Sequence, residues 1–243
     1  GLYRDNALIT AALRGNDLVT LVLALPLLAV GLVLSRRGSP RALLIWLAML
    51  GYMLYNYAFY LFGAAFNRFF LLYVALLALS IYALIFALPR IDATAIRQRF
   101  RARTPARWVG GFMLVFALLL AVLWTSRALA FVLTGEVPQD ILNTGHPTGV
   151  VYAADLSLLV PALALGGVWL WQRRPWGYVL GAMLMVKATT YALAMIAMSV
   201  FAARAGLPGA WDLAPLWAVL GAGCLLASGF LLGNLDETSS LLK

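Results

Sequence analysis

Long apolar runs, separated by short polar segments, dominate the chain. A helix rises about 1.5 Å per residue, so each of seven runs is long enough to cross a hydrocarbon core of roughly 30 Å. The predicted spans are 18–34, 42–65, 69–88, 108–133, 150–171, 176–201 and 213–232. This pattern predicts an all-α integral membrane protein, a bundle of seven transmembrane helices that forms one domain over residues 18–234.

Two short segments flank the predicted bundle. Residues 1–17 mix polar and apolar positions, which favours a short amphipathic helix on the outer membrane surface. Residues 235–243 are then a short tail on the cytoplasmic side. The first residue is Gly1 and not Met, and the sequence does not decide whether this is the natural start.

Arginine side chains gather in alternate connections between the predicted spans. Residues 35–41, 89–107 and 172–175 are rich in arginine, whereas each of the other three connections carries at most one Lys or Arg. Connections that carry an excess of Lys and Arg remain in the cytoplasm. The alternation therefore predicts an N-terminus outside and a C-terminus in the cytoplasm, and it agrees with an odd number of spans.

Composition supports the membrane assignment and removes one class of partner. Hydrophobic residues make up 64% of the chain and charged residues 11%, against about 25% charged residues in a typical soluble domain. The net charge of +9 lies in connections between spans and on no separate polar domain, so we predict no nucleic-acid partner. The bias toward Ala, Leu and Arg is typical of a bacterial genome of high GC content, which favours the inner (cell) membrane.

Metal and cofactor chemistry has few possible ligands in this chain. Cys224 is the single cysteine and His146 the single histidine. Zinc, haem and iron–sulfur sites need more of these side chains than the chain offers. Phosphate-binding loops and the common hydrolase motifs are absent as well. We therefore predict no metal site, no cofactor and no catalytic residues.

Three ionisable residues fall inside predicted spans: Arg127, Asp155 and Lys187. Each costs roughly 2.5–3.5 kcal/mol or more at the membrane centre, so each is expected to face the bundle interior and a partner. The short connection 172–175 makes the spans that carry Asp155 and Lys187 antiparallel neighbours. We therefore predict that Asp155 and Lys187 are coupled, directly, through Tyr191 or through a ligand, with Arg127 as the rival partner of Asp155.

Polar aromatic and amide side chains mark a second surface in the span 42–65. Asn56 and Tyr60 lie four residues apart, on one face of the outer half of this helix. Helix rise places them at a depth similar to that of Arg127, Asp155 and Tyr191. The pattern predicts a polar, outward-facing cavity that these residues line together with Lys187.

Three functions agree with these residues. The first is the binding or transport of a lipid-like or small amphipathic ligand in an outward-facing intramembrane pocket, with the lipid bilayer and possible bound lipid as partners. The second is an accessory or assembly subunit that contacts other membrane subunits through its polar residues. The third and weakest is a cofactor-free membrane enzyme, because only one acid and one lysine are predicted to be buried.

Overall fold

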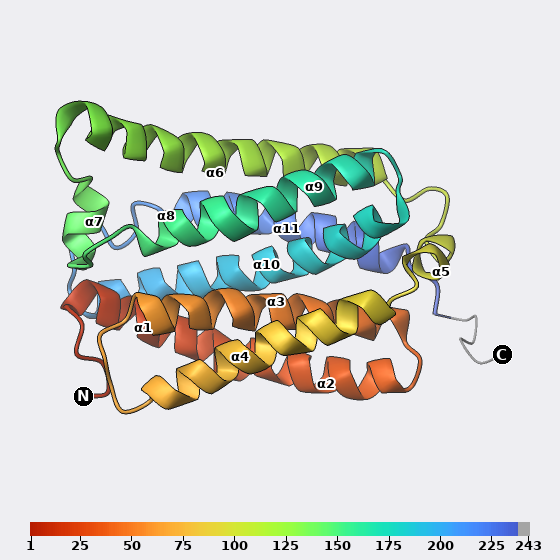
Figure 1. Ribbon diagram of the computed structural model, residues 1–243, viewed down its shortest axis with the longest axis horizontal. Coiled ribbons are helices and arrows are strands. Elements are labelled where there is room, and N and C mark those ends of the chain that lie inside the picture. Colours follow the sequence, from red (N-terminus) through yellow and green to blue (C-terminus); the bar gives the residue numbers. More distant parts are fainter. Residues whose placement is uncertain (238–243) are drawn as a thin grey trace.

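The computed structural model describes residues 1–237 of the chain. In this part the secondary structure is helical, with a single isolated β-bridge between Phe100 and Leu235. The helices in chain order are α1 (Ala7–Val19), η1 (Thr20–Ala24), α2 (Leu25–Arg36), α3 (Pro40–Phe62), α4 (Phe70–Ala87), η2 (Leu88–Arg90), α5 (Ala93–Gln98), α6 (Ala106–Thr134), α7 (Gln139–Thr144), α8 (Val150–Ala154), η3 (Asp155–Leu159), α9 (Val160–Trp171), α10 (Pro175–Arg204) and α11 (Ala214–Gly233) (Figure 1).

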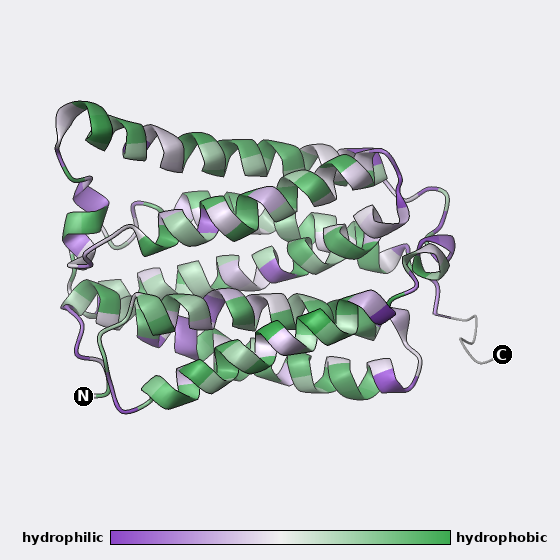
Figure 2. Ribbon diagram, viewed as in Figure 1, coloured by the Kyte–Doolittle hydropathy of each residue, from purple (hydrophilic) through white to green (hydrophobic). Residues whose placement is uncertain are grey.

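Seven helical segments within residues 1–237 are long and apolar enough to span a membrane. They are Ala7–Arg36, Pro40–Phe62, Phe70–Arg90, Ala106–Thr134, Val150–Trp171, Pro175–Arg204 and Ala214–Gly233. Hydrophobic residues predominate along these segments (Figure 2), and many of their large apolar side chains are exposed, including Leu71 at 78% and Leu133 at 84%. Such a surface requires lipid as solvent, so the chain is a multi-pass helical membrane protein.

The first span starts earlier than the sequence predicts. Helix α1 begins at Ala7, where the side chain of Asn6 accepts a hydrogen bond from Ile9 N at 2.9 Å, and runs through η1 into α2. Most of the segment 1–17 is therefore the first three turns of the span and not a separate surface helix. Gly15 shows why this part is buried: a Cβ there would lie 2.5 Å from Met198 N of α10. The polar residues Asn16 and Asp17 interrupt the apolar run, so the hydrophobic pattern alone did not place these turns in the span.

Helix α10 lies at the centre of the bundle and packs against α1, α3, α9 and α11 (Figure 1). Its contact with α9 is close at Gly177, where a Cβ would lie 2.3 Å from Leu170 N. Pro175 begins α10, and the turn before it joins α9 to α10 as the predicted antiparallel hairpin. Lys187 is consequently held inside the molecule by neighbours on several sides.

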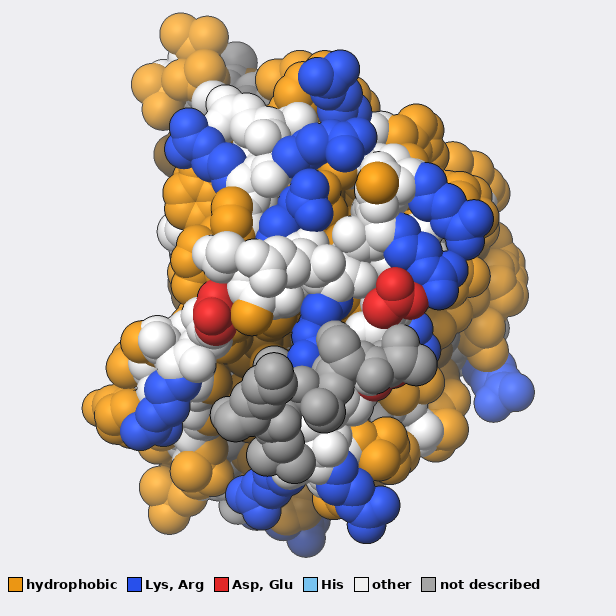
Figure 3. Space-filling model, turned by 90° about the vertical axis from the view of Figure 1, so that its right-hand side faces the viewer, with side chains coloured by type: hydrophobic (Ala, Val, Ile, Leu, Met, Phe, Trp, Pro, Cys, Tyr) orange, Lys and Arg blue, Asp and Glu red, His pale blue; other side chains and the backbone are white. Residues whose placement is uncertain are grey.

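The two ends of the bundle differ in charge. We call the end formed by residues 35–41, 88–107, 172–175 and 233–237 the basic end, and Figure 3 shows the arginine side chains that gather there. The N-terminus lies at the opposite end and the chain leaves α11 at the basic end, as an odd number of spans requires (Figure 1).

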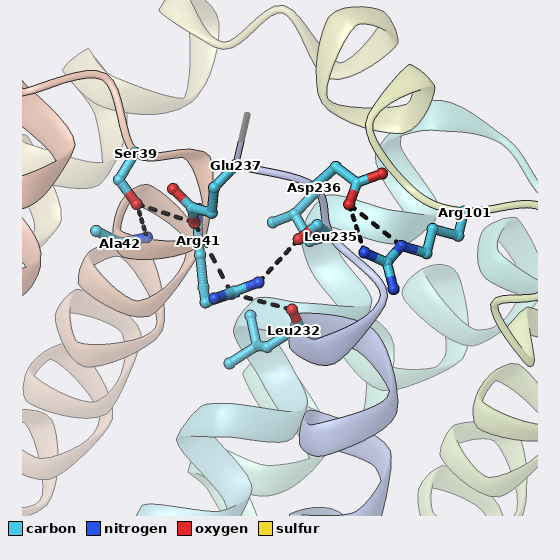
Figure 4. Close-up of polar contacts among 8 residues, drawn as sticks. All are labelled: Ser39, Arg41, Ala42, Arg101, Leu232, Leu235, Asp236 and Glu237. Atoms are coloured by element: carbon cyan, nitrogen blue, oxygen red, sulfur yellow. Dashed lines mark hydrogen bonds and ion pairs between the residues drawn. The ribbon is translucent and has the colours of Figure 1, made fainter. Parts of the chain in front are cut away.

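The residues that follow α11 are fastened to the basic end (Figure 4). Arg41 donates to Leu232 O in the last turn of α11 at 3.0 Å, which satisfies a carbonyl that the helix end leaves free, and to Leu235 O after the helix at 2.8 Å. Arg101 donates to Asp236 Oδ1 at 2.7 Å. This hydrogen bond with an arginine lowers the pKa of the Asp236 carboxyl. Residues 238–243 of the predicted tail lie outside the described part of the chain.

Candidate functional site

A hydrogen-bonded cluster joins the first span to α3. We call it the first-span network; its residues are Asn16, Asp17, Thr20, Tyr52, Asn56 and Tyr60. Asn16 donates to Asn56 Oδ1 at 2.9 Å and accepts from Tyr52 at 3.1 Å. Tyr60 donates to Asp17 Oδ1 at 2.8 Å, and Tyr3 donates to the other oxygen of Asp17.

The first-span network satisfies its own polar groups. Asn56 Nδ2 donates to Thr20 at 3.2 Å, and the Thr20 hydroxyl in turn lies 2.9 Å from that of Tyr52. Within residues 1–237 the buried side-chain atoms without any hydrogen-bond partner belong to Asp5, Arg99 and His146, and none belongs to this cluster. A closed set of hydrogen bonds in lipid fixes two helices against each other and leaves no group free to bind a ligand.

A second cluster surrounds Lys187 on a neighbouring face of α3. We call it the lysine site; its residues are Tyr55, Trp124, Asp155, Lys187 and Tyr191. Both carboxylate oxygens of Asp155 are occupied, since Tyr55 donates to one at 2.6 Å and Trp124 Nε1 donates to the other at 2.7 Å. Asp155 and Lys187 are only 5% and 4% exposed.

Lys187 has aromatic rings as its partners. Its Nζ lies 3.8 Å from the ring centroid of Tyr55 and 4.9 Å from that of Tyr191. Within residues 1–237 no carboxylate or carbonyl oxygen forms an ion pair or hydrogen bond with this nitrogen. Asp155 is therefore linked to Lys187 through Tyr55, whose hydroxyl binds the carboxylate and whose ring faces the amine.

Two π-helical segments accompany these clusters. Segment η1 begins at Thr20 of the first-span network, and η3 begins at Asp155 of the lysine site. A proline follows each of them, Pro26 in α2 and Pro161 in α9, and removes one backbone donor from the helical ladder. Such π-segments are frequent at functional sites, because they turn side chains and carbonyls out of the regular helical register.

The predicted site residues fall into three separate groups. Asp155, Lys187 and Tyr191 meet in the lysine site, whereas Asn56 and Tyr60 face the first span and belong to the other cluster. The expected single surface that joins Asn56 to Asp155 is therefore absent from the arrangement of the described residues. Tyr52 is the nearest link, with its ring edge-on to Tyr191 at 6.3 Å.

Arg127 lies apart from the residues that the sequence grouped with it. Its guanidinium pairs with Asp140 at 2.6 Å, and its side chain is 41% exposed. Asp140 precedes the start of the fifth span in sequence, on α7, and also accepts a hydrogen bond from Tyr152 at 2.5 Å. Asp140 on α7 is thus the acidic partner of Arg127, and Arg127 does not pair with Asp155.

The end opposite the basic end is closed by α7 and the N-terminal residues. Asn6 donates to the carbonyls of Asn143 and Thr144 at 2.9 and 3.0 Å. The His146 ring lies tilted against that of Phe59, with the ring centroids 6.0 Å apart. Burial lowers the pKa of the His146 imidazole, while the carboxylate of Asp5 acts in the opposite direction. These contacts join the connection between the fourth and fifth spans to the first residues of the chain.

Sequence reasoning missed several residues of both clusters. The sequence pattern places Asn16 and Asp17 in a surface segment, although they lie four and three residues before Thr20, which puts all three on one helical face. Tyr55 and Trp124 gave no signal, because an aromatic residue in an apolar run is equally compatible with contact to lipid. Their hydrogen bonds to Asp155 depend on how three helices meet.

Comparison with known proteins adds no relative: no family model, no curated protein and no solved structure matches the chain. Within residues 1–237 no group of three or more His, Cys, Asp or Glu side chains is placed to hold a metal ion. The site must therefore be interpreted from its own geometry.

Proposed function

We propose that this membrane protein binds a small amphipathic ligand at the lysine site, with Lys187 as the anchor for an acceptor group of the ligand. The observation that carries the proposal is the environment of Lys187 Nζ. Lys187 is deeply buried, and the rings of Tyr55 and Tyr191 face its nitrogen, which forms no ion pair with a carboxylate within residues 1–237.

The energetics favour an additional partner for Lys187. A lysine at the centre of a membrane costs roughly 2.5–3.5 kcal/mol or more. Cation–π contacts return about 0.5–2 kcal/mol, and Asp155 is already engaged by Tyr55 and Trp124. A carboxylate, phosphate or carbonyl oxygen of a ligand would complete the three donors of the ammonium group.

The two rings beside Lys187 are not equally enclosed, which indicates a route for the ligand. Tyr55 is 5% exposed, whereas Tyr191 is partly exposed on α10. A ligand would approach past Tyr191 and leave its apolar part among the membrane-facing side chains. The π-segment η3 next to Asp155 offers the local change of helix geometry that opening requires.

The test measures which molecules the purified protein retains in nanodiscs formed directly from the membrane. Mass spectrometry compares the wild type with Lys187→Met and with the control Asn56→Leu, which alters the first-span network. We expect one class of molecule to fall at least about tenfold in Lys187→Met, as loss of a charge-assisted hydrogen bond implies, and to persist in Asn56→Leu. Equal retention in all three proteins would contradict the proposal.

We further propose that the basic end faces the cytoplasm and that the protein resides in the cell membrane, on the strength of the arginine distribution. A reporter that is active only outside the cytoplasm is expected to be active when fused near Asn143 and silent when fused near Arg99. Reversed activities would overturn the orientation, and equal activities would overturn the separation of these two connections by the membrane.

A further inference from the structure

A groove opens between α6 and α11 at the basic end, away from the lysine site. These two helices flank the bundle and contact each other sparsely, mainly where Phe112 fills the space beside Gly223. The groove is lined by Arg103, Pro105, Trp108, Leu226, Phe230, Gly233 and Asn234. Trp108 and Phe230 meet edge to face inside it, with their ring centroids 5.6 Å apart.

The apolar part of the groove is open to the membrane side. Trp108 is 49% exposed, Phe230 42% and Leu226 56%. A Cβ placed on Gly229 or on Gly233 would meet no atom within 4 Å, so these glycines leave space along α11 and do not serve helix packing. Exposed aromatic and aliphatic side chains on a membrane span are covered by lipid acyl chains.

The polar end of the groove carries an arginine with spare donors. Arg103 is exposed, and its Nε makes one long hydrogen bond of 3.4 Å to Asn234. In the described residues Arg103 has no ion pair with a carboxylate, unlike Arg101 next to it. Arg103 belongs to the basic end, over which Figure 3 shows many arginine side chains. Charge at this mouth is thus complementary to an anionic group at the membrane interface.

We propose that this groove holds one anionic phospholipid of the surrounding membrane. Its phosphate binds the guanidinium of Arg103, which offers the planar fork of donors that phosphate oxygens accept. One acyl chain lies against Trp108, Phe230 and Leu226. This lipid site is independent of the ligand proposed at Lys187, because none of the groove residues belongs to the lysine site.

The test titrates the purified protein in detergent with phosphatidylglycerol and, separately, with phosphatidylcholine of the same chains, and counts bound lipids by native mass spectrometry. For the wild type we expect one phosphatidylglycerol to bind at least about fivefold tighter than phosphatidylcholine, the effect of one arginine near an anionic headgroup. Arg103→Gln is expected to abolish this preference, while Arg37→Gln, which removes the same charge elsewhere on the basic end, keeps it.

A second pair of variants tests whether lipid binding requires the space in the groove, with the charge of Arg103 left unchanged. Gly233→Trp fills the groove without altering charge and is expected to lose the bound lipid, whereas Gly233→Ala leaves room and is expected to retain it. Circular dichroism and the thermal midpoint show that each variant is folded. Equal binding of both lipids, equal loss in Arg103→Gln and Arg37→Gln, or full binding in folded Gly233→Trp would each overturn the proposal.

Discussion

The first-span network and the lysine site lie on neighbouring faces of α3, and they differ in how completely their polar groups are matched. Asn16 makes three side-chain hydrogen bonds within its cluster, whereas Lys187 makes cation–π contacts only. Both clusters adjoin a π-segment followed by a proline, so backbone irregularity does not distinguish them. A buried charge whose partners are aromatic rings, rather than a polar residue with several hydrogen bonds, therefore marks the candidate binding site.

The largest effect on stability is expected for Asn16→Leu. This change removes the donor to Asn56 Oδ1 and one acceptor of the Tyr52 hydroxyl, although Thr20 still contacts both residues. Each buried group that is left unsatisfied costs about 1–3 kcal/mol. We expect the free energy of unfolding in detergent to fall by about 3 kcal/mol, with retention at the lysine site unchanged in the folded fraction. A fall below about 0.5 kcal/mol would mean that the first-span network does not stabilise the bundle.

An intermediate effect is expected for Asp155→Asn, since the carboxylate accepts hydrogen bonds from Tyr55 and Trp124. Hydrogen bonds to a charged group contribute about 1.5–3 kcal/mol each, and asparagine retains one acceptor, so we expect a loss of about 2 kcal/mol. Thermal unfolding of the single variant gives this value. Wild-type stability in Asp155→Asn would contradict the assigned role of the carboxylate.

A double-mutant cycle between Asp155→Asn and Lys187→Met measures the link inside the lysine site. Coupling of about 0.5–3 kcal/mol is expected, because Tyr55 contacts both residues. The same cycle in a Tyr55→Phe background is expected to give a smaller value, as the hydroxyl that binds Asp155 is gone. Strict additivity in the first cycle would show that the two buried charges act independently.

The smallest effect is expected for Arg127→Gln. The ion pair with Asp140 is exposed on both sides, and such pairs contribute about 0–1 kcal/mol, less at high salt. The cycle of Arg127→Gln with Asp155→Asn is expected to be additive. Strong coupling there would show that Arg127 is a partner of Asp155, as predicted from the sequence, and would contradict its separation from the lysine site.

The sequence predicted the number of spans and most of their limits, since apolar run length is a property of the chain alone. It failed at Ala7–Val19, because Asn16 and Asp17 are polar within a span whose partners come from α3. The short hairpin fixes the neighbours, so Asp155 and Lys187 lie in one cluster, but Tyr55 and not the expected Tyr191 lies between them. The sequence could not place Tyr55 or the α6–α11 groove, which depend on rotation and tilt of helices about their axes.

Lys187 and Lys243 are the two lysines of the chain, which gives a direct measurement of the central claim. A nitrogen NMR spectrum of protein labelled at the lysine Nζ contains two side-chain signals, and Lys243→Arg assigns them. We expect the chemical shift of the Lys187 signal to differ between protein purified with its native lipids and delipidated protein. It should return to its first value when the extracted molecules are added back. An identical Lys187 signal in all three samples would contradict a ligand at this site.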